Sequence, residues 1–185
     1  MSTLNPHQLD AEALYATLLA DVKAGLAGVA DVAIVGIHSG GAWIAERLAA
    51  DLGLADRCGV LDVSFYRDDY AKKGLPAEVK PTHIGFNVDA ATILLVDDVL
   101  YTGRTTRAAI NELFDYGRPA RIMLAALVDR GERQLPVAAD FVAAHVAVEP
   151  GQALVLKRTD DGAVAAGAAT AATARFTLTI DSAKP

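Results

Sequence analysis

The fold is decided by the stretch Ile93-Leu94-Leu95-Val96-Asp97-Asp98-Val99-Leu100-Tyr101-Thr102-Gly103-Arg104-Thr105-Thr106. Its first four residues are apolar, which is typical of a strand buried on both faces of a parallel sheet. Two aspartates follow where we expect this strand to end, and a short loop with glycine and threonines comes next. Residues 107–116 have the amphipathic spacing of a helix. The order is therefore strand, acidic pair, turn and helix.

The turn has the features of a phosphate-binding site. At the start of a helix, unpaired backbone N–H groups point at one place, and the helix dipole adds positive potential there. Gly103 allows a ligand to approach the backbone closely, and three threonines add hydroxyl donors. The lysine and the spacing of a P-loop are absent, which favours a single phosphate over a triphosphate.

The acidic pair adds a second kind of binding group. Asp97 and Asp98 come just before the turn, where carboxylates can accept hydrogen bonds from vicinal sugar hydroxyls or bind Mg²⁺. A phosphate site beside a diol site indicates a ribose 5-phosphate. The alternative is an ordinary strand–loop–helix unit whose acidic residues only offset a helix dipole.

A second strand–turn–helix unit lies earlier in the chain. An apolar strand is predicted at residues 31–37, and it ends in the glycine-rich turn Gly36-Ile37-His38-Ser39-Gly40-Gly41 before the next helix. Such turns cluster at the carboxyl ends of parallel strands, where ligands bind. Further strands are predicted at residues 58–65, 83–88, 122–128, 141–148, 153–156 and 175–180, and a first helix from Asn5-Pro6 to about residue 26.

Composition predicts one domain, residues 1–185, with its core at about residues 29–148. A chain of 185 residues, of which 52% are hydrophobic and 22% charged, can bury one sizeable core. Its net charge of −6 argues against a large surface for nucleic acid or acidic membrane. No apolar run approaches the roughly 20 residues of a membrane span, and the N-terminus lacks the pattern of a secretion signal. We therefore expect a cytoplasmic protein with no membrane partner.

The stretch at residues 93–106 resembles the phosphoribosyl-pyrophosphate (PRPP) binding motif of type I phosphoribosyltransferases. The run from Val96 to Arg107, together with Asp129-Arg130-Gly131, resembles the members of that family that both attenuate pyrimidine operons and act as uracil phosphoribosyltransferases. The resemblance covers about residues 31–142. It implies an α/β fold with a mainly parallel sheet flanked by helices, a flexible loop and a small hood.

The resemblance also implies the site residues. Catalytic roles fall to Asp97 and Asp98, which would hold the ribose hydroxyls, and to Arg67, which would meet the pyrophosphate from a mobile lid at residues 66–82. The substrate-binding residues would be Val99, Leu100, Tyr101, Thr102, Gly103, Arg104, Thr105 and Thr106 for the ribose 5-phosphate, His38, Ser39, Gly40 and Gly41 for the pyrophosphate, and Asp129 and Arg130 for the base.

Several of these residues have a simpler interpretation. Gly40 stands where the family usually has an arginine, which removes a cation from the pyrophosphate loop, and His38 is either a partial substitute or an ordinary loop histidine. Arg67 is either a ligand of the pyrophosphate or a solvated charge. Asp129 and Arg130 either line the base pocket or form a local ion pair.

The implied reaction converts uracil and PRPP to uridine monophosphate (UMP) and pyrophosphate. Mg²⁺ would be bound mainly through PRPP oxygens and water, so we expect no cluster of protein ligands for a metal. Relatives that use purines place an acidic residue four positions after the first aspartate of the motif, and that position is Tyr101 here, which favours uracil. We also expect a homo-oligomer.

Two other functions stay open at this stage. One is a phosphoribosyltransferase for a purine or for orotate. The other is an attenuator that binds messenger RNA and senses uridine nucleotides. RNA binding is not favoured, because 17 basic residues face 23 acidic ones and the dense basic grouping consists of Arg104, Arg107, Arg118, Arg121, Arg130 and Arg133, near the expected active site.

Overall fold

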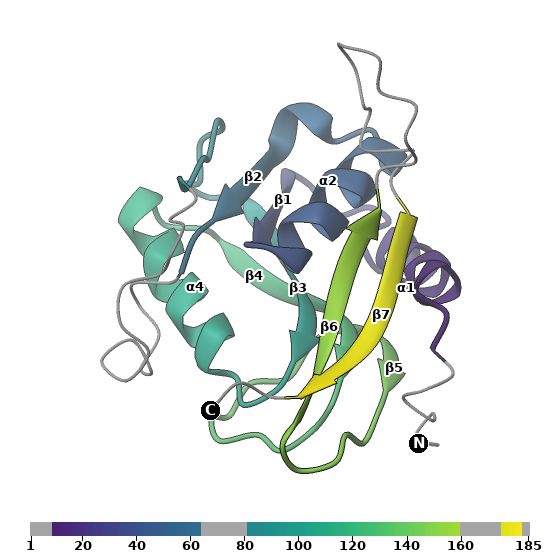
Figure 1. The fold of residues 1–185 in the computed structure, drawn as a ribbon. Coiled ribbons are helices and arrows are strands. Elements are labelled where there is room, and N and C mark those ends of the chain that lie inside the picture. Colours follow the sequence, from purple (N-terminus) through teal and green to yellow (C-terminus); the bar gives the residue numbers. More distant parts are fainter. Residues whose placement is uncertain (1–8, 64–80, 160–174, 183–185) are drawn as a thin grey trace.

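The computed structural model describes residues 9–63, 81–159 and 175–182 (Figure 1). The chain forms a five-stranded sheet with helices around it and a separate two-stranded sheet. In chain order the elements are α1 (Ala11–Gly25), β1 (Val32–Ile37), α2 (Gly40–Asp51), the 3-10 helix η2 (Ala55–Arg57), β2 (Cys58–Leu61), β3 (Thr92–Leu100), α4 (Arg104–Tyr116), β4 (Arg121–Asp129), β5 (Phe141–His145), β6 (Gln152–Thr159) and β7 (Arg175–Ser182).

The strand order of the large sheet explains where a ligand site arises. The order is β2-β1-β3-β4-β5, and every neighbouring pair is parallel. The chain leaves β1 toward one edge to form β2 and then returns to form β3 on the other side of β1. Ligands of open α/β sheets bind at such a reversal, outside the carboxyl ends of the strands. The two glycine-containing turns therefore meet at the switch point between β1 and β3.

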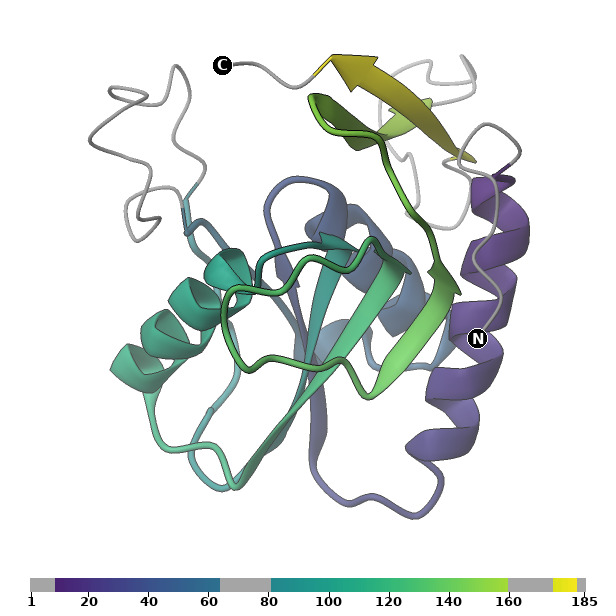
Figure 2. The same cartoon turned by 90° about the horizontal axis from the view of Figure 1, so that it is seen from below.

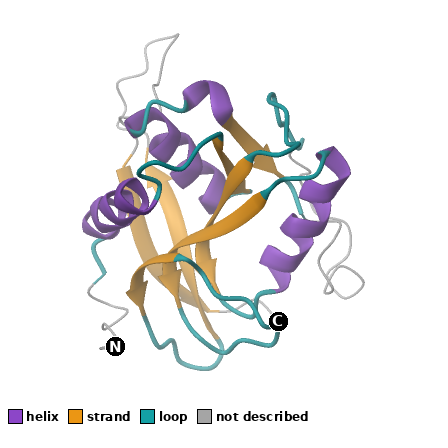
Figure 3. Cartoon of the chain, turned by 180° about the vertical axis from the view of Figure 1, so that it is seen from behind, coloured by secondary structure: helices purple, strands orange, loops and turns teal. Residues whose placement is uncertain are grey.

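Helices cover both faces of this sheet, as its apolar strands require. One cluster of buried side chains joins α1 and α2 to one face and includes Leu18, Ile44 and Leu94. A second cluster joins α4 to the other face and includes Leu113 and Ile93. Figure 2 shows α1 and α4 on opposite sides of the sheet, and Figure 3 shows the helices around it from behind. No helix in the described part of the chain is long and apolar enough to cross a membrane.

Strands β6 and β7 form the hood. They pair antiparallel, with Leu154 opposite Ile180, and the pair lies over one end of the sheet (Figure 2). The hood shares the α1–α2 core through Leu154, Leu156 and Phe176. The backbone N–H of Phe176 also donates to Glu12 of α1 at 2.7 Å. The α/β fold with a parallel sheet, flanking helices and a small hood is thus the one that the sequence predicts.

Several sequence-based boundaries are wrong. Strands β2 and β5 are shorter than predicted and end at Leu61 and His145. Helix α1 begins at Ala11, because the side chain of Asp10 caps it by accepting from the N–H groups of Glu12 and Ala13, whereas Asn5-Pro6 lies outside the described residues. Strand β3 does not end at the acidic pair but continues to Leu100. Residues 83–88 are not a strand, since they make a single bridge, between His83 and Val60.

Candidate functional site

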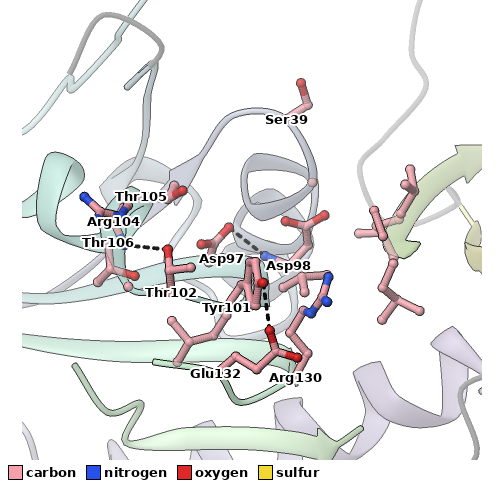
Figure 4. A pocket seen from close by; sticks show the side chains of 18 of the residues that line it. Ser39, Asp97, Asp98, Tyr101, Thr102, Arg104, Thr105, Thr106, Arg130 and Glu132 are labelled. Atoms are coloured by element: carbon pink, nitrogen blue, oxygen red, sulfur yellow. Dashed lines mark hydrogen bonds between the residues drawn. The ribbon is translucent and has the colours of Figure 1, made fainter. Parts of the chain in front are cut away.

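A cavity of about 900 Å³ lies between the carboxyl ends of the parallel strands and the hood. Four segments line it. They are the turn after β1 with the start of α2 (His38, Ser39, Gly40 and Trp43), the motif from β3 into α4 (Asp97 to Thr106), the loop after β4 (Arg130, Glu132 and Gln134) and the hood (Pro150 to Leu156). Figure 4 shows the side chains around it. The cavity therefore gathers nearly all of the predicted site residues that the structure describes.

The predicted phosphate cradle is the turn before α4. Gly103 is the N-cap of α4 and has φ 88°, a left-handed conformation that glycine adopts without strain. The hydroxyl of Thr102 accepts from the backbone N–H of Arg104 at 3.3 Å. The hydroxyl of Thr106 is buried, with the residue 1% exposed, and it has no hydrogen-bond partner among the described residues. An unpaired buried hydroxyl is costly unless a ligand satisfies it, so the cradle fits a phosphate oxygen at this point.

The loop after β4 holds the cradle in shape. The carbonyl of Thr102 accepts from the backbone N–H groups of Gln134 at 3.0 Å and Leu135 at 3.1 Å. A Cβ on Gly103 would lie 3.2 Å from the side chain of Val137. The Nε of Arg104 donates to Gln134 at 3.0 Å, which turns the Arg104 side chain toward this loop. Contacts with the loop after β4 thus restrict the backbone conformation of a turn that would be flexible because of Gly103.

The acidic pair lies within β3, and its two side chains point in different directions (Figure 4). Successive side chains of a strand alternate between its faces, so Asp97 lies on the side of α4 and Asp98 on the side of Ser39. Both line the cavity, and Oδ1 of Asp97 accepts from the backbone N–H of Asp98 at 3.0 Å. Burial raises the pKa of the Asp98 carboxyl, against the hydrogen bonds that it accepts.

The turn after β1 lies against Asp98. A Cβ at Gly40 would come within 2.3 Å of Oδ2 of Asp98, so the carboxylate occupies the space of a side chain at position 40. A Cβ at Gly41 would lie 2.4 Å from the backbone oxygen of Val96, which means that α2 packs directly on the backbone of β3. His38, Ser39 and Gly40 line the cavity. Gly41 is not among its described lining residues and instead sets the close approach of α2.

Tyr101 and Arg130 form one wall of the cavity. The guanidinium carbon of Arg130 lies 4.0 Å from the centre of the Tyr101 ring, a cation–π distance. The Tyr101 hydroxyl donates to Glu132 at 2.8 Å, and this hydrogen bond raises the pKa of the phenol. Nη1 of Arg130 donates to the carbonyl of Gln152 in the hood at 3.2 Å. The wall therefore connects the motif, the loop after β4 and the hood.

Asp129 forms its ion pair with Arg133. Its other oxygen accepts from the backbone N–H of Gly131 at 2.8 Å. Burial disfavours the charged carboxyl, but Arg133 and the N–H of Gly131 hold the pKa of Asp129 below its ordinary value. Arg133 also donates to the carbonyl of Leu100 at 3.4 Å. Asp129 is not among the described residues that line the cavity, and its contacts brace the loop that carries Arg130.

Sequence reasoning missed the contribution of the hood. Gln152, Ala153, Leu154, Val155 and Leu156 line the cavity, as does Trp43 at the start of α2. Their sequence signal is only the alternation of a short strand, which says nothing about a ligand. Their position comes from the packing of β6 against α2 and β3. Glu132 and Gln134 were also missed, although they follow a strand that ends at the same edge as the motif.

Two predictions fall outside the described residues. Arg67 belongs to residues 64–80, and the proposed lid at residues 66–82 lies almost wholly there. The catalytic assignment of Arg67 and the lid both stay predictions. The described chain ends at Val63 on one side of this range and resumes at Pro81 on the other.

The donor groups in the cavity suit Mg²⁺ only together with a substrate. Asp97 and Asp98 offer carboxylate oxygens, which Mg²⁺ prefers, but they point to different sides of β3. Among the described residues no group of three or more His, Cys, Asp or Glu side chains could hold a metal ion. Two carboxylates leave most of an octahedral shell to substrate and water oxygens, which fits a metal that arrives with PRPP.

Known proteins match this chain over most of its length. A family model for the phosphoribosyl transferase domain matches residues 7–150. The bifunctional protein PyrR of Ralstonia nicotianae is 53% identical over 178 residues, 95% of this chain and 97% of the relative. The bifunctional protein PyrR of Nitrosococcus oceani is 44% identical over 164 residues, 86% of this chain and 93% of the relative. The chain belongs to the phosphoribosyl transferase family, with the bifunctional PyrR proteins. The family and the enzyme class predicted from the sequence are confirmed.

Solved structures of the family share the fold. A purine phosphoribosyltransferase from Pyrococcus horikoshii superposes with a TM-score of 0.58 and 25% identity, covering 81% of this chain and 93% of that one. A hypoxanthine phosphoribosyl transferase of Trypanosoma cruzi gives a TM-score of 0.57 with 21% identity, covering 75% and 76% of the two chains. These matches confirm the type I phosphoribosyltransferase-like fold.

Proposed function

We propose that this protein transfers ribose 5-phosphate from PRPP to uracil, giving UMP and pyrophosphate. The observation that carries the proposal is the cavity itself. It joins a phosphate cradle with an unpaired buried Thr106 hydroxyl, two carboxylates and a second glycine turn within one space of about 900 Å³. These groups match the parts of PRPP in the order in which that molecule carries them.

Each part of the site has a role in this reaction. The cradle at Thr102 to Thr106 binds the 5-phosphate through backbone N–H groups and hydroxyls. Asp97 and Asp98 accept hydrogen bonds from the ribose hydroxyls, and the turn at residues 38–40 faces the pyrophosphate. The bond from the anomeric carbon to the pyrophosphate oxygen breaks, a bond to N1 of uracil forms, and the N1 proton is released. Because the transition state is oxocarbenium-like, positioning and exclusion of water provide much of the catalysis.

Mg²⁺, when bound with PRPP, supplies charge neutralisation for the pyrophosphate as it leaves. The carboxylate of Asp98 lies against Gly40 in the pyrophosphate turn, so it is the protein group best placed to hold the metal or its water. The chain needs no further carboxylate for this, since substrate oxygens complete the shell.

The wall at Tyr101 supports uracil over a purine. Tyr101 occupies the position at which purine-using relatives have an acidic base, and its hydroxyl is engaged by Glu132. Arg130 stacks on the ring and reaches the hood through Gln152, which narrows this end of the cavity. The N–H of a pyrimidine is acidic enough to react without a strong protein base. A purine would lack the acidic side chain that purine-using relatives provide at the position of Tyr101.

The test is a panel of bases. With PRPP and Mg²⁺, uracil should be converted to its nucleotide at least about tenfold faster than hypoxanthine, guanine, adenine or orotate, a ratio worth about 1.4 kcal/mol. Product is measured as nucleotide and pyrophosphate released together. Preferential turnover of any purine would refute the base assignment and leave the fold and the PRPP site unaffected.

The relatives are called bifunctional proteins, which indicates a second function, and the resemblance found in the sequence makes binding of messenger RNA the candidate. Three arginines of the dense basic grouping are already engaged within the protein. Arg133 pairs with Asp129, Arg104 donates to Gln134, and Arg118 donates to the carbonyl of Phe114 at 2.6 Å. We therefore propose that RNA binding is weak and secondary to catalysis.

A filter-binding titration with the upstream leader of the organism's pyrimidine operon tests this ranking. At near-physiological salt we expect binding weaker than about micromolar, falling steeply as salt rises, as it does for contacts made mainly to phosphates. Tight binding that depends on a uridine nucleotide would show that regulation is the leading function.

A further inference from the structure

Glu112 is a buried acidic residue that the proposed reaction does not use. It lies two turns into α4 from the cradle, on the face that packs against the sheet, and it is 6% exposed. One carboxylate oxygen, Oε2, has no hydrogen-bond partner among the described residues. Burial raises the pKa of this carboxyl, the nearby Asp62 and Asp115 add to the effect, and the hydrogen bond from Thr82 opposes it. Burying a carboxyl group with an unsatisfied oxygen lowers stability, so a functional role would explain its presence.

The other oxygen of Glu112 holds a link between distant segments. The hydroxyl of Thr82 donates to Oε1 of Glu112 at 2.5 Å. The same hydroxyl accepts from the backbone N–H of Asp62 at 3.0 Å, across 20 positions of sequence. The hydroxyl donates in one direction and accepts in the other, so Thr82 connects α4 to the residue that follows β2.

The link continues to the pyrophosphate turn. The carbonyl of Leu61, next to Asp62, accepts from the backbone N–H of His38 at 2.9 Å. His38 is the first residue of the turn that lines the cavity. Residues 82 and 83 are also fixed to β2, because His83 and Val60 exchange two backbone hydrogen bonds of 2.8 and 2.9 Å. An unbroken set of hydrogen bonds thus runs from the cradle helix to the opposite loop.

We propose that Glu112 and Thr82 are positioning residues that set the separation between the two phosphate-binding loops of the cavity. This inference rests on the proposed function. Apolar contacts also join these elements, since Leu61 and Val63 share a cluster with Ala109 and Leu113. Such contacts resist separation but allow sliding, whereas the hydrogen-bonded link fixes the register of α4 against the end of β2. PRPP spans both loops, so its binding depends on that register more than binding of uracil does.

Kinetics of four single variants test the proposal. Thr82→Val and Glu112→Leu each keep the shape of the site but remove the link, and we expect the KM for PRPP to rise about three- to tenfold, the value of one hydrogen bond. The KM for uracil and kcat at saturating PRPP should change less than twofold. Thr82→Ser keeps the hydroxyl donor, and Glu112→Gln keeps an oxygen acceptor. In both variants the KM for PRPP should stay near the wild-type value.

A double variant and a matched control complete the set. Thr82→Val combined with Glu112→Leu should be no worse than either single change, because the two residues act through one interaction. Asn111→Ala changes an exposed side chain of the same helix and should leave the KM for PRPP unchanged. Additive effects in the double variant, or an unchanged KM for PRPP in folded Thr82→Val, would overturn the proposal.

Amide hydrogen exchange separates this idea from the proposed function. In Thr82→Val the amide of His38 should exchange faster than in the wild type, while the amide of Ile34, inside the preceding strand β1, should not change. Equal exchange at His38 in both proteins would overturn the link, even if the enzyme turns over PRPP. Failure of the wild type to use PRPP with any base would instead count against the proposed function, and the exchange experiment would still decide the link.

Discussion

Replacing Asp98 by asparagine is expected to lower kcat/KM for PRPP by about ten- to 150-fold. The carboxylate lies in the cavity beside Gly40 and is placed to accept from a ribose hydroxyl or to hold the water of Mg²⁺. A hydrogen bond to a charged group is worth about 1.5–3 kcal/mol, and asparagine keeps the size but loses the charge. The effect should fall on turnover and not on folding, because asparagine fills the same space beside Gly40.

Steady-state rates with PRPP varied at saturating uracil provide the measurement. Asp97→Asn should give a loss of similar size, because Asp97 lines the cavity from the other side of β3. Asp56→Asn, an exposed change in the 3-10 helix η2, is the matched control and should leave the rates unchanged. If both variants fold and keep full activity, the proposed role of Asp97 and Asp98 in the reaction is wrong.

Gly40→Ala should cost nearly as much activity as the loss of the Asp98 charge. The new Cβ would lie 2.3 Å from Oδ2 and 2.8 Å from Cβ of Asp98, so the whole side chain must leave its position. We expect kcat/KM for PRPP to fall by at least about tenfold, the equivalent of 1.4 kcal/mol, with a smaller change in the free energy of unfolding.

Alanine substitutions at two other glycines provide the comparison for Gly40→Ala. At Gly41 the added Cβ meets the backbone oxygen of Val96 at 2.4 Å, which cannot move without the sheet, so Gly41→Ala should lower the free energy of unfolding by about 1–3 kcal/mol. At Gly85 the nearest atom would be 3.5 Å away, an ordinary contact, and Gly85→Ala should be tolerated. Thermal unfolding followed by circular dichroism compares all three. If Gly40→Ala has the kinetics of the wild type, the reaction does not depend on the position of the Asp98 side chain.

The sequence by itself determined the parts of this protein that depend on near neighbours. The run Ile93 to Val96 is apolar without alternation, and it forms a fully buried parallel strand. The glycine and threonines that follow it form the start of a helix, and the Thr106 hydroxyl there is buried without a partner among the described residues. The turn at residues 36–41 meets them because the carboxyl ends of parallel strands share one edge. Family and fold follow from short local patterns of this kind, and the phosphate cradle that the same patterns predict stays a prediction.

Tertiary structure decided what depends on residues far apart in the chain. Residues 83–88 alternate like a strand, yet alternation reports burial on one face, and Ile84 and Phe86 pack on the core without a paired neighbour. Asp129 pairs with Arg133 and leaves Arg130 to Tyr101, a choice that the order of charged residues in the loop does not reveal. The hood lines the cavity only because β6 and β7 fold back over the sheet.

The same reason explains Gly40 and Glu112. A missing side chain at position 40 looks like a lost cation in the sequence, but in the structure its space holds the carboxylate of Asp98, 58 positions later. Glu112 looks like a solvated helix residue, yet it is buried against Thr82. Local patterns fix the backbone because helices and strands repeat over a few residues. Which side chains share one space is fixed by packing between elements, and that information is not local.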